Sequence, residues 1–192
     1  MDKQKNMILK AALAEFGFDG WSAALLSAAR KRKINPSQLK KLFPGGHDDL
    51  LEYFFSWVDD SMMEKLNKTT ARNMRIRDRV MAGVAARIDV LSSHKDAAVA
   101  ALQQQAHLKN AGTVAQRLWT TSDRIWTWAG DTSDDYNRYT KRALLSGVIT
   151  ATTLFWINDD SKDHAATRGF LARRIDNVVS IGQTISKIFK SA

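Results

Sequence analysis

The pattern of apolar and polar positions predicts α-helices along almost the whole chain. Apolar residues recur every three or four positions, the spacing that gives a helix one buried face. Only two prolines and ten glycines interrupt stretches rich in Ala, Leu, Arg and Lys, which favour helix over strand. We therefore predict an all-α fold. Helices are expected over about 7–16, 21–29, 35–43, 49–66, 75–91, 94–108, 113–128, 132–157 and 164–190.

The first 47 residues have the pattern of a separate helix-turn-helix unit. Gly17 and Gly20 interrupt the apolar repeat, and Asn35-Pro36-Ser37 opens a short third helix that ends at Phe43-Pro44. This unit holds nine Lys and Arg against three Asp and Glu, so most of the formal charge of +9 lies here. DNA, an anionic membrane and a merely solvated basic face are the open interpretations. We place a domain boundary between residues 47 and 48.

The longest uncharged run, Ala143 to Ile157, predicts a buried helix. It would span roughly 22 Å at 1.5 Å per residue, short of the ~30 Å hydrocarbon core of a bilayer. Leu145, Val148, Thr152 and Phe155 are expected to share one face, on which threonine places a hydroxyl in an apolar wall. A central core helix and the wall of a ligand cavity both fit this pattern.

A polar, turn-rich segment precedes the uncharged run. Gly130 and Asp131 indicate the end of one helix, and Thr132 with Asp135 indicates a capping box that opens the next. The segment is therefore expected to form a corner between two helices.

Residues in and after this corner carry a resemblance to a known family. They are Trp128-Ala129-Gly130-Asp131, Ser133, Asp135, Asn137, Tyr139-Thr140, Arg142, Asp160-Ser161, Phe170-Leu171, Arg174 and Ile181-Gly182. With them, residues 126 to about 187 resemble the ubiquinone-biosynthesis accessory protein family, the ninth protein of the coenzyme Q series. The resemblance implies a TetR-like homodimer without catalytic residues or cofactor. It also implies that a hydrophobic cavity binds an isoprenoid quinone precursor, a lipid that is presented to the di-iron demethoxyubiquinone hydroxylase.

Under this resemblance, residues 48–192 form a helical lipid-binding and dimerisation domain. Core packing is the alternative for each of its candidate lipid contacts, because large apolar side chains at helical spacing usually fill a core. The candidates are Phe54, Trp57, Met62, Trp119, Trp126, Leu145, Val148, Thr152 and Phe155.

The same resemblance places a docking surface for the hydroxylase at the corner. Arg138 stands where many relatives carry an aromatic residue, which predicts a more polar contact. Arg142 could instead pair with Asp135 or another acid of its own chain. The predicted docking residues are Asp131, Asp135, Asn137, Arg138, Tyr139 and Arg142.

The N-terminal unit also resembles the DNA-binding domain of TetR-type regulators, so a ligand-responsive repressor is the alternative function. Those regulators usually carry a Tyr and a His late in the recognition helix, where this chain has Lys40 and Leu42. Pro44-Gly45-Gly46 replaces the acidic-lysine turn that usually follows. We therefore do not expect DNA to be the partner.

No motif predicts catalysis or a metal site. The chain has no cysteine, its four histidines are far apart, and it shows no Gly-rich phosphate loop or nucleophile elbow. Residues 1–10 lack a secretory apolar region, so we expect a bacterial cytoplasmic protein. Its basic, amphipathic last turn, residues 185–190, suits the inner face of an anionic membrane, and packing in a dimer interface is the alternative.

Overall fold

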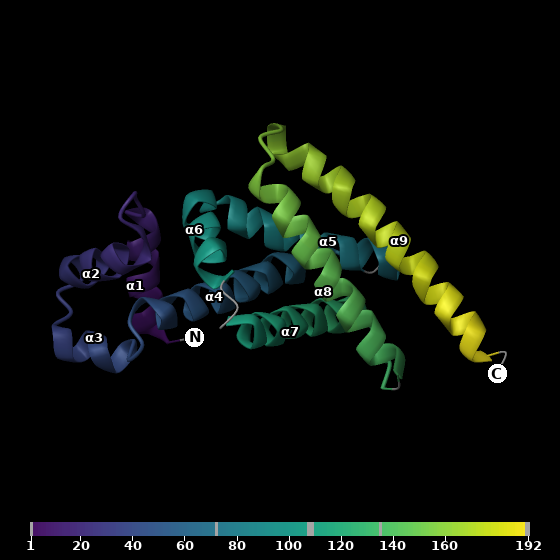
Figure 1. The fold of residues 1–192 in the computed structure, drawn as a ribbon, viewed down its shortest axis with the longest axis horizontal. Coiled ribbons are helices and arrows are strands. Elements are labelled where there is room, and N and C mark those ends of the chain that lie inside the picture. The colour runs from purple at the N-terminus through teal and green to yellow at the C-terminus, as the bar shows by residue number, and fades with distance from the viewer. Residues whose placement is uncertain (1, 72, 107–109, 135, 191–192) are drawn as a thin grey trace. The chain divides into compact units, whose positions relative to one another are not determined.

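The computed structural model describes residues 2–71, 73–106, 110–134 and 136–190, with side chains up to Asn177. Every regular element within these residues is a helix, which confirms the all-α prediction (Figure 1). The elements are α1 (Lys3–Ala14), α2 (Gly20–Lys31), α3 (Pro36–Leu42), α4 (His47–Asn67), α5 (Ile76–Ser92), α6 (Lys95–Gln105), α7 (Ala111–Ala129), α8 (Tyr136–Ile157), the 3₁₀ turn η2 (Lys162–His164) and α9 (Ala165–Lys190).

The helices form two compact units that alternate along the chain. Unit 1 consists of residues 1–61 and 90–110, and unit 2 of residues 62–89 and 111–192. Helices α4 and α5 therefore each begin in one unit and end in the other. The domain boundary expected between residues 47 and 48 lies at the end of the helix-turn-helix sequence pattern, and it stays a prediction.

Unit 1 is organised around a buried tryptophan of α2. The Trp21 indole N–H donates to the carbonyl of Ala97 in α6 at 3.1 Å, so its one polar atom is satisfied inside the core. Its ring lies 5.1 Å from the ring of Phe54 in α4. One aromatic side chain thus joins the helix-turn-helix to two later helices of the unit.

The third helix begins where the sequence predicts. Asn35 accepts a hydrogen bond from the Gln38 N–H at 2.9 Å, and the Gln38 side chain accepts one from the Asn35 N–H at 3.2 Å. This reciprocal capping box, with Pro36 in the first turn, starts α3. None of the residues of α3 is buried, so this helix is fixed by its cap more than by packing.

Unit 2 is centred on α8, which packs against α7 on one side and α9 on the other (Figure 1). The uncharged run forms most of α8, and its inward side is apolar because the helix is enclosed there. The buried apolar cluster of the unit consists of Met62, Leu66, Val80, Val84, Ala86, Ile125, Ala129, Leu145, Val148, Ile149, Leu171 and Ile175.

Close packing between α5 and α7 generates a stability prediction at Gly83. A Cβ atom added to Gly83 would lie 2.6 Å from Cγ2 of Ile125, so Gly83→Ala forces two helices apart. We expect the free energy of unfolding, measured in urea, to fall by about 1–3 kcal/mol. Gly112→Ala in α7 is the control, since its Cβ meets nothing within 4 Å. Equal changes in the two variants would contradict this packing.

Candidate functional site

Helix α7 ends at a glycine corner. Gly130 has a φ of 92°, in the left-handed region that glycine adopts without strain. Its N–H donates to the carbonyl of Thr127 at 3.1 Å, and the N–H of Asp131 donates to the carbonyl of Trp126 at 3.0 Å. These two bonds make a Schellman motif, which confirms the helix end predicted at Gly130 and Asp131.

A buried ion pair closes the corner. Arg142 of α8 donates from Nη1 to Oδ2 of Asp131 at 2.8 Å and from Nε to Oδ1 of Asp123 at 2.6 Å. The side chains of Arg142 and Asp131 are only 3% and 4% exposed. Removing one member of such a pair leaves an uncompensated charge in the interior, which is strongly destabilising. One guanidinium therefore ties together α7, the corner and α8.

Asp131 also binds a second cation and a hydroxyl. Lys141 Nζ lies 2.7 Å from Asp131 Oδ1, and the Ser133 hydroxyl donates to the same oxygen at 2.9 Å. Burial alone would raise the pKa of Asp131, but hydrogen bonds from Lys141, Arg142 and Ser133 lower it from 3.8 to about 2. Asp131 therefore stays ionised down to acidic pH.

The predicted docking residues separate into buried and exposed sets. Asp131 and Arg142 bind each other in the interior, which confirms the alternative that Arg142 pairs with an acid of its own chain. Asp135 lies outside the described residues. Exposed at the start of α8 are Asn137, Arg138 and Tyr139.

The exposed set offers an aromatic pair beside a cation. Tyr139 is 60% exposed, and its ring lies 6.0 Å from that of Trp119 in α7. Arg138 Nη2 lies 3.3 Å from Asp123 Oδ1. An exposed pair of this kind contributes about 1 kcal/mol or less, so Arg138 can exchange it for an acid of a partner. The buried network thus supports a surface suited to a partly polar contact.

Behind the corner, the inward side of α8 brings several predicted lipid contacts together. Leu145 and Val148 lie in the same buried cluster as Met62 of α4, and Trp126 packs against it. The Trp126 indole N–H donates to the carbonyl of Lys141 at 3.1 Å, which connects the cluster to the corner. These four candidates therefore belong to one apolar region of unit 2.

Thr152, on the same side of α8, has a buried hydroxyl without a hydrogen-bond partner among the described residues. Its neighbour Thr153 instead donates to the carbonyl of Ile149 at 2.8 Å, the usual arrangement for threonine within a helix. An unsatisfied buried hydroxyl costs roughly 1–3 kcal/mol. A polar atom of a ligand or a water molecule would be stabilised next to Thr152.

The remaining lipid candidates lie elsewhere. Phe54 and Trp57 stack within unit 1, with ring centroids 6.2 Å apart. Trp119 lies beside Tyr139, away from the buried cluster. The common face expected for Thr152 and Phe155 is wrong, because Phe155 is 39% exposed and stacks on Phe170 of α9 at 4.5 Å. Trp156, one residue later, takes the buried position.

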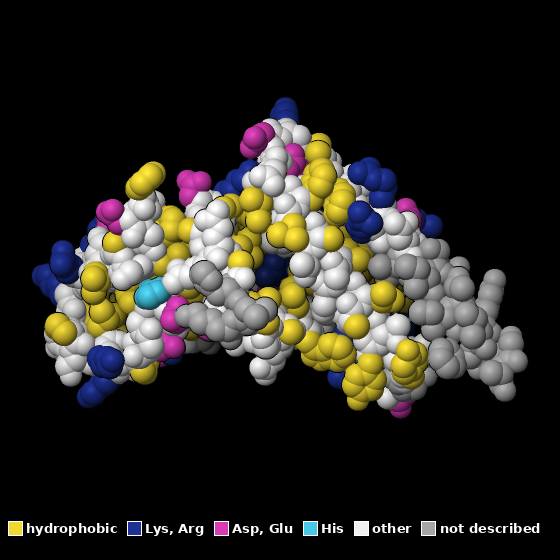
Figure 2. All heavy atoms as spheres, in the orientation of Figure 1, with side chains coloured by type: hydrophobic (Ala, Val, Ile, Leu, Met, Phe, Trp, Pro, Cys, Tyr) yellow, Lys and Arg dark blue, Asp and Glu magenta, His cyan; other side chains and the backbone are white. Residues whose placement is uncertain are grey.

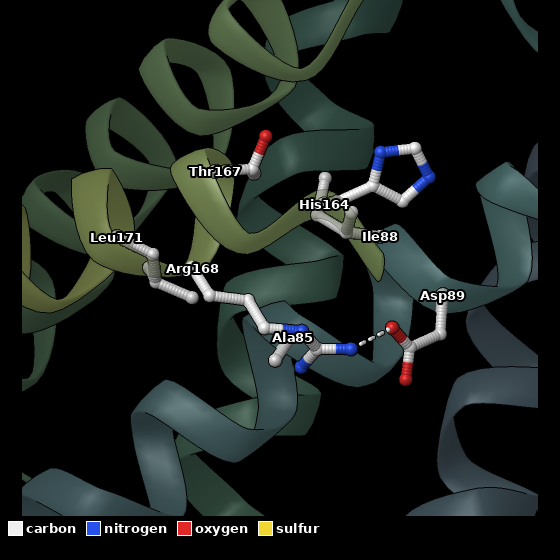
Figure 3. A pocket seen from close by; sticks show the side chains of 7 residues that line it. All are labelled: Ala85, Ile88, Asp89, His164, Thr167, Arg168 and Leu171. Carbon is white, nitrogen blue, oxygen red and sulfur yellow. Dashed lines mark hydrogen bonds and ion pairs between the residues drawn. The ribbon is translucent and has the colours of Figure 1, made fainter. Parts of the chain in front are cut away.

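A small hollow of about 10 Å³ opens between α5 and the start of α9 (Figure 3). Arg168 reaches across it, with Nη2 2.7 Å from Asp89 Oδ1. Asp163 and His164 have left-handed φ angles of 53° and 51°, and Nδ1 of His164 is buried without a partner in the described structure. The sequence gives no signal for this hollow. Its lining consists of Ala85, Ile88, Asp89, His164, Thr167, Arg168 and Leu171.

Nowhere in the described part of the chain do three or more His, Asp or Glu side chains come together as metal ligands. None of the helices, over the residues described, has the length and apolar character needed to cross a membrane.

Residues 111–182, which include the corner, α8 and much of α9, match the COQ9 family model. The chain is similar in sequence to the COQ9 proteins. It is 27% identical over 191 residues to the mitochondrial ubiquinone biosynthesis protein COQ9 of Drosophila melanogaster, covering 97% of this chain and 59% of that protein. The Homo sapiens COQ9 is 24% identical over 194 residues, with 97% and 61% covered.

One COQ9 relative has a higher identity over a shorter stretch. The Bos taurus COQ9 is 38% identical over 71 residues, which cover 37% of this chain and 22% of that protein. The chain spans about three fifths of the length of the curated COQ9 relatives that match along most of it. The family resemblance of the corner and α8 is confirmed.

A solved structure confirms the TetR-like fold. The TetR transcriptional regulator from Nitrosomonas europaea superposes with a TM-score of 0.76, covering 93% of this chain and 99% of the regulator. At 17% sequence identity, this likeness concerns the fold alone. The COQ9-like sequence is thus carried by a TetR-like arrangement of helices.

The buried pair predicts an acid-dependent loss of stability. Asp131→Asn keeps the shape of the side chain but leaves Arg142 without its buried carboxylate, so we expect the free energy of unfolding at neutral pH to fall by about 3–5 kcal/mol. In the folded protein the pKa of Asp131, about 2, lies below the ordinary aspartate pKa of 3.8. This contribution is therefore present above the unfolded pKa and is lost as the pH falls toward the folded pKa.

Urea unfolding at several pH values measures both effects. The difference between native protein and Asp131→Asn should shrink as the medium is acidified through that window. Asp134→Asn, a change at an exposed acid near the corner, should have little effect at any pH. A difference that stays constant with pH would show that Asp131 does not act through its charge.

Proposed function

We propose that the protein is a non-enzymatic lipid-binding accessory protein of ubiquinone biosynthesis. In this proposal it binds an isoprenoid quinone precursor within unit 2 and presents it to the di-iron demethoxyubiquinone hydroxylase, as a homodimer and without a cofactor. The match of residues 111–182 to the COQ9 family supports the pathway. The observation that carries the ligand class is the unpaired hydroxyl of Thr152 inside an apolar face of the matched segment.

An isoprenoid quinone precursor has the chemistry that this face would stabilise. Its polyprenyl tail suits the apolar side chains around Leu145 and Val148, and an oxygen of its ring would accept a hydrogen bond from Thr152. Ligand pockets usually enclose about 300–1,000 Å³, whereas the hollow of Figure 3 holds only about 10 Å³. Uptake of a long tail therefore requires apolar side chains of unit 2 to move apart.

Presentation to the hydroxylase is assigned to the exposed start of α8. Tyr139, whose ring lies tilted against that of Trp119, supplies an aromatic anchor, and Arg138 supplies a charge for an acidic partner. The buried Asp131–Arg142 pair fixes the helix that carries them. Its relatives are named as mitochondrial proteins, while the bacterial cytoplasm expected for this chain stays a prediction.

The lipid proposal is tested by native mass spectrometry with extraction of the bound molecules. We expect a dimer that carries an isoprenoid quinone. Thr152→Val should reduce the fraction of loaded protein several-fold, because it removes the hydroxyl from the apolar face. The same change should raise the free energy of unfolding of the lipid-free protein by roughly 1 kcal/mol, since an unsatisfied polar group disappears.

Thr153→Val is the matched control for Thr152→Val. Its hydroxyl is satisfied by the carbonyl of Ile149, so its loss should leave lipid loading unchanged and should not stabilise the protein. If Thr152→Val and Thr153→Val carry the same fraction of bound lipid, Thr152 does not contact the lipid. Recovery of the native protein without any lipid would contradict the proposed function.

The docking surface is tested by measuring binding of the hydroxylase to purified variants. Tyr139→Ala should weaken binding about tenfold or more if the exposed ring is an anchor of the interface. Phe18→Ala removes a fully exposed aromatic side chain from unit 1 and should leave binding unchanged. Lipid loading should be retained in both variants. Unaltered hydroxylase binding by Tyr139→Ala would exclude the start of α8 as the contact.

A TetR-type repressor is the second candidate function. It is favoured by the exposed basic residues of the well-capped helix α3, including Lys40 and Lys41. It requires sequence-selective DNA binding that survives moderate salt, whereas unselective, salt-labile binding reports only phosphate neutralisation. A lipid-free dimer that selects one promoter fragment would favour the repressor.

A further inference from the structure

Helices α2 and α3 leave an open groove of about 410 Å³ in unit 1. Its floor contains the buried side chains of Leu25 and Phe43, and Leu26 on one wall is 49% exposed. Apolar surface therefore remains in contact with water on both sides of the groove. The lining residues are Ser22, Leu25, Leu26, Pro36, Leu39, Lys40, Phe43, Pro44, Gly45, Gly46 and His47.

Unpaired cations lie on and next to the helices that form this groove. Among the described residues, no ion pair is formed by Arg30, Lys33, Lys40 or Lys41, and all four are exposed. Lys40 lines the groove itself. Arg30 lies one helical turn after Leu26, on the same side of α2. Figure 2 shows dark-blue and yellow side chains interspersed at the α2–α3 end of unit 1.

Several cations of unit 2 are paired: Lys141 and Arg142 bind Asp131, and Arg168 binds Asp89. Others, such as Lys68 and Lys162, are exposed and unpaired in the described structure. The α2–α3 face differs from them because its unpaired cations lie on the helices that also form an apolar groove.

We propose that this surface, the basic groove, docks the protein on an anionic lipid membrane. Such a membrane offers phosphates to the rim cations and, just beneath them, an apolar layer for Leu26 and Leu39. Duplex DNA offers phosphates but would leave the apolar groove facing water. The membrane therefore matches both the charge and the exposed apolar surface, and the inference does not depend on the quinone cargo.

Flotation of the full chain with lipid vesicles tests the basic groove. The vesicles contain phosphatidylcholine alone or phosphatidylcholine with phosphatidylglycerol. We expect binding to the anionic vesicles only, and a loss of about tenfold or more in K40E/K41E, because two rim charges are reversed. The control K68E/K162E makes the same change in net charge at exposed lysines of unit 2 and should bind within about twofold of the native protein.

A second pair of variants tests the apolar contribution. Leu26→Ser should weaken vesicle binding severalfold, whereas Leu154→Ser, at a side chain of α8 that is 60% exposed, should not. Thermal unfolding followed by circular dichroism confirms that each variant is folded. Equal losses in K40E/K41E and K68E/K162E would overturn the inference, because they would show attraction by net charge alone.

Competition distinguishes the other anionic partners. A short duplex DNA or polyglutamate that binds more tightly than the vesicles, with the same dependence on Lys40 and Lys41, would also overturn the inference. Lipid extracted from the dimer reports on the quinone site separately. If the protein fails to bind vesicles but still carries quinone, the membrane inference is rejected and the proposed function is retained. If it binds vesicles but carries no quinone, only the proposed ligand is rejected.

Discussion

Asp131 and Arg142 face each other in the interior of unit 2, where neither charge would be stable without the other. Gly130 reverses the chain direction, and the ion pair then fixes where α8 lies against the end of α7. Arg142 also begins the buried side of α8, three residues before Leu145. The rotation of α8 about its own axis, and hence which residues face the core, therefore depends on this pair.

Two different surfaces follow from that one rotation. Tyr139 and Arg138 face the solvent at the start of α8, while Leu145 and Thr152 face the core further along. Under the proposed function, α8 would hold the docking surface and the lipid contact at a fixed separation, because the hydrogen-bonded backbone of a helix keeps its residues in a constant geometry. Loading of a lipid at Thr152 and contact by a partner at Tyr139 would then act on the same element.

Features set by local chemistry could be predicted from the sequence. The end of α7 needs only a residue that tolerates left-handed backbone, and Gly130 supplies it. The start of α3 needs only a reciprocal cap, which Asn35 and Gln38 provide. The absence of charged residues from Ala143 to Ile157 likewise predicts a buried helix.

Features set by tertiary contact could not be predicted in the same way. Asp123, the second partner of Arg142, stands 19 positions away on another helix, and no spacing rule connects them. Whether Phe155 or Trp156 turns inward depends on how α9 packs on α8, which the helical repeat leaves open. The alternation of the two units is also not visible in the sequence, since α4 and α5 continue through the boundaries without a break.

The alternation also means that residues 1–47 cannot be separated from the rest of unit 1 without loss of contacts. If this segment were replaced by that of another protein, the Ala97 carbonyl would lose the hydrogen bond from the Trp21 indole. The helix-turn-helix therefore shares its core with α4 and α6, and its replacement would have to restore these contacts.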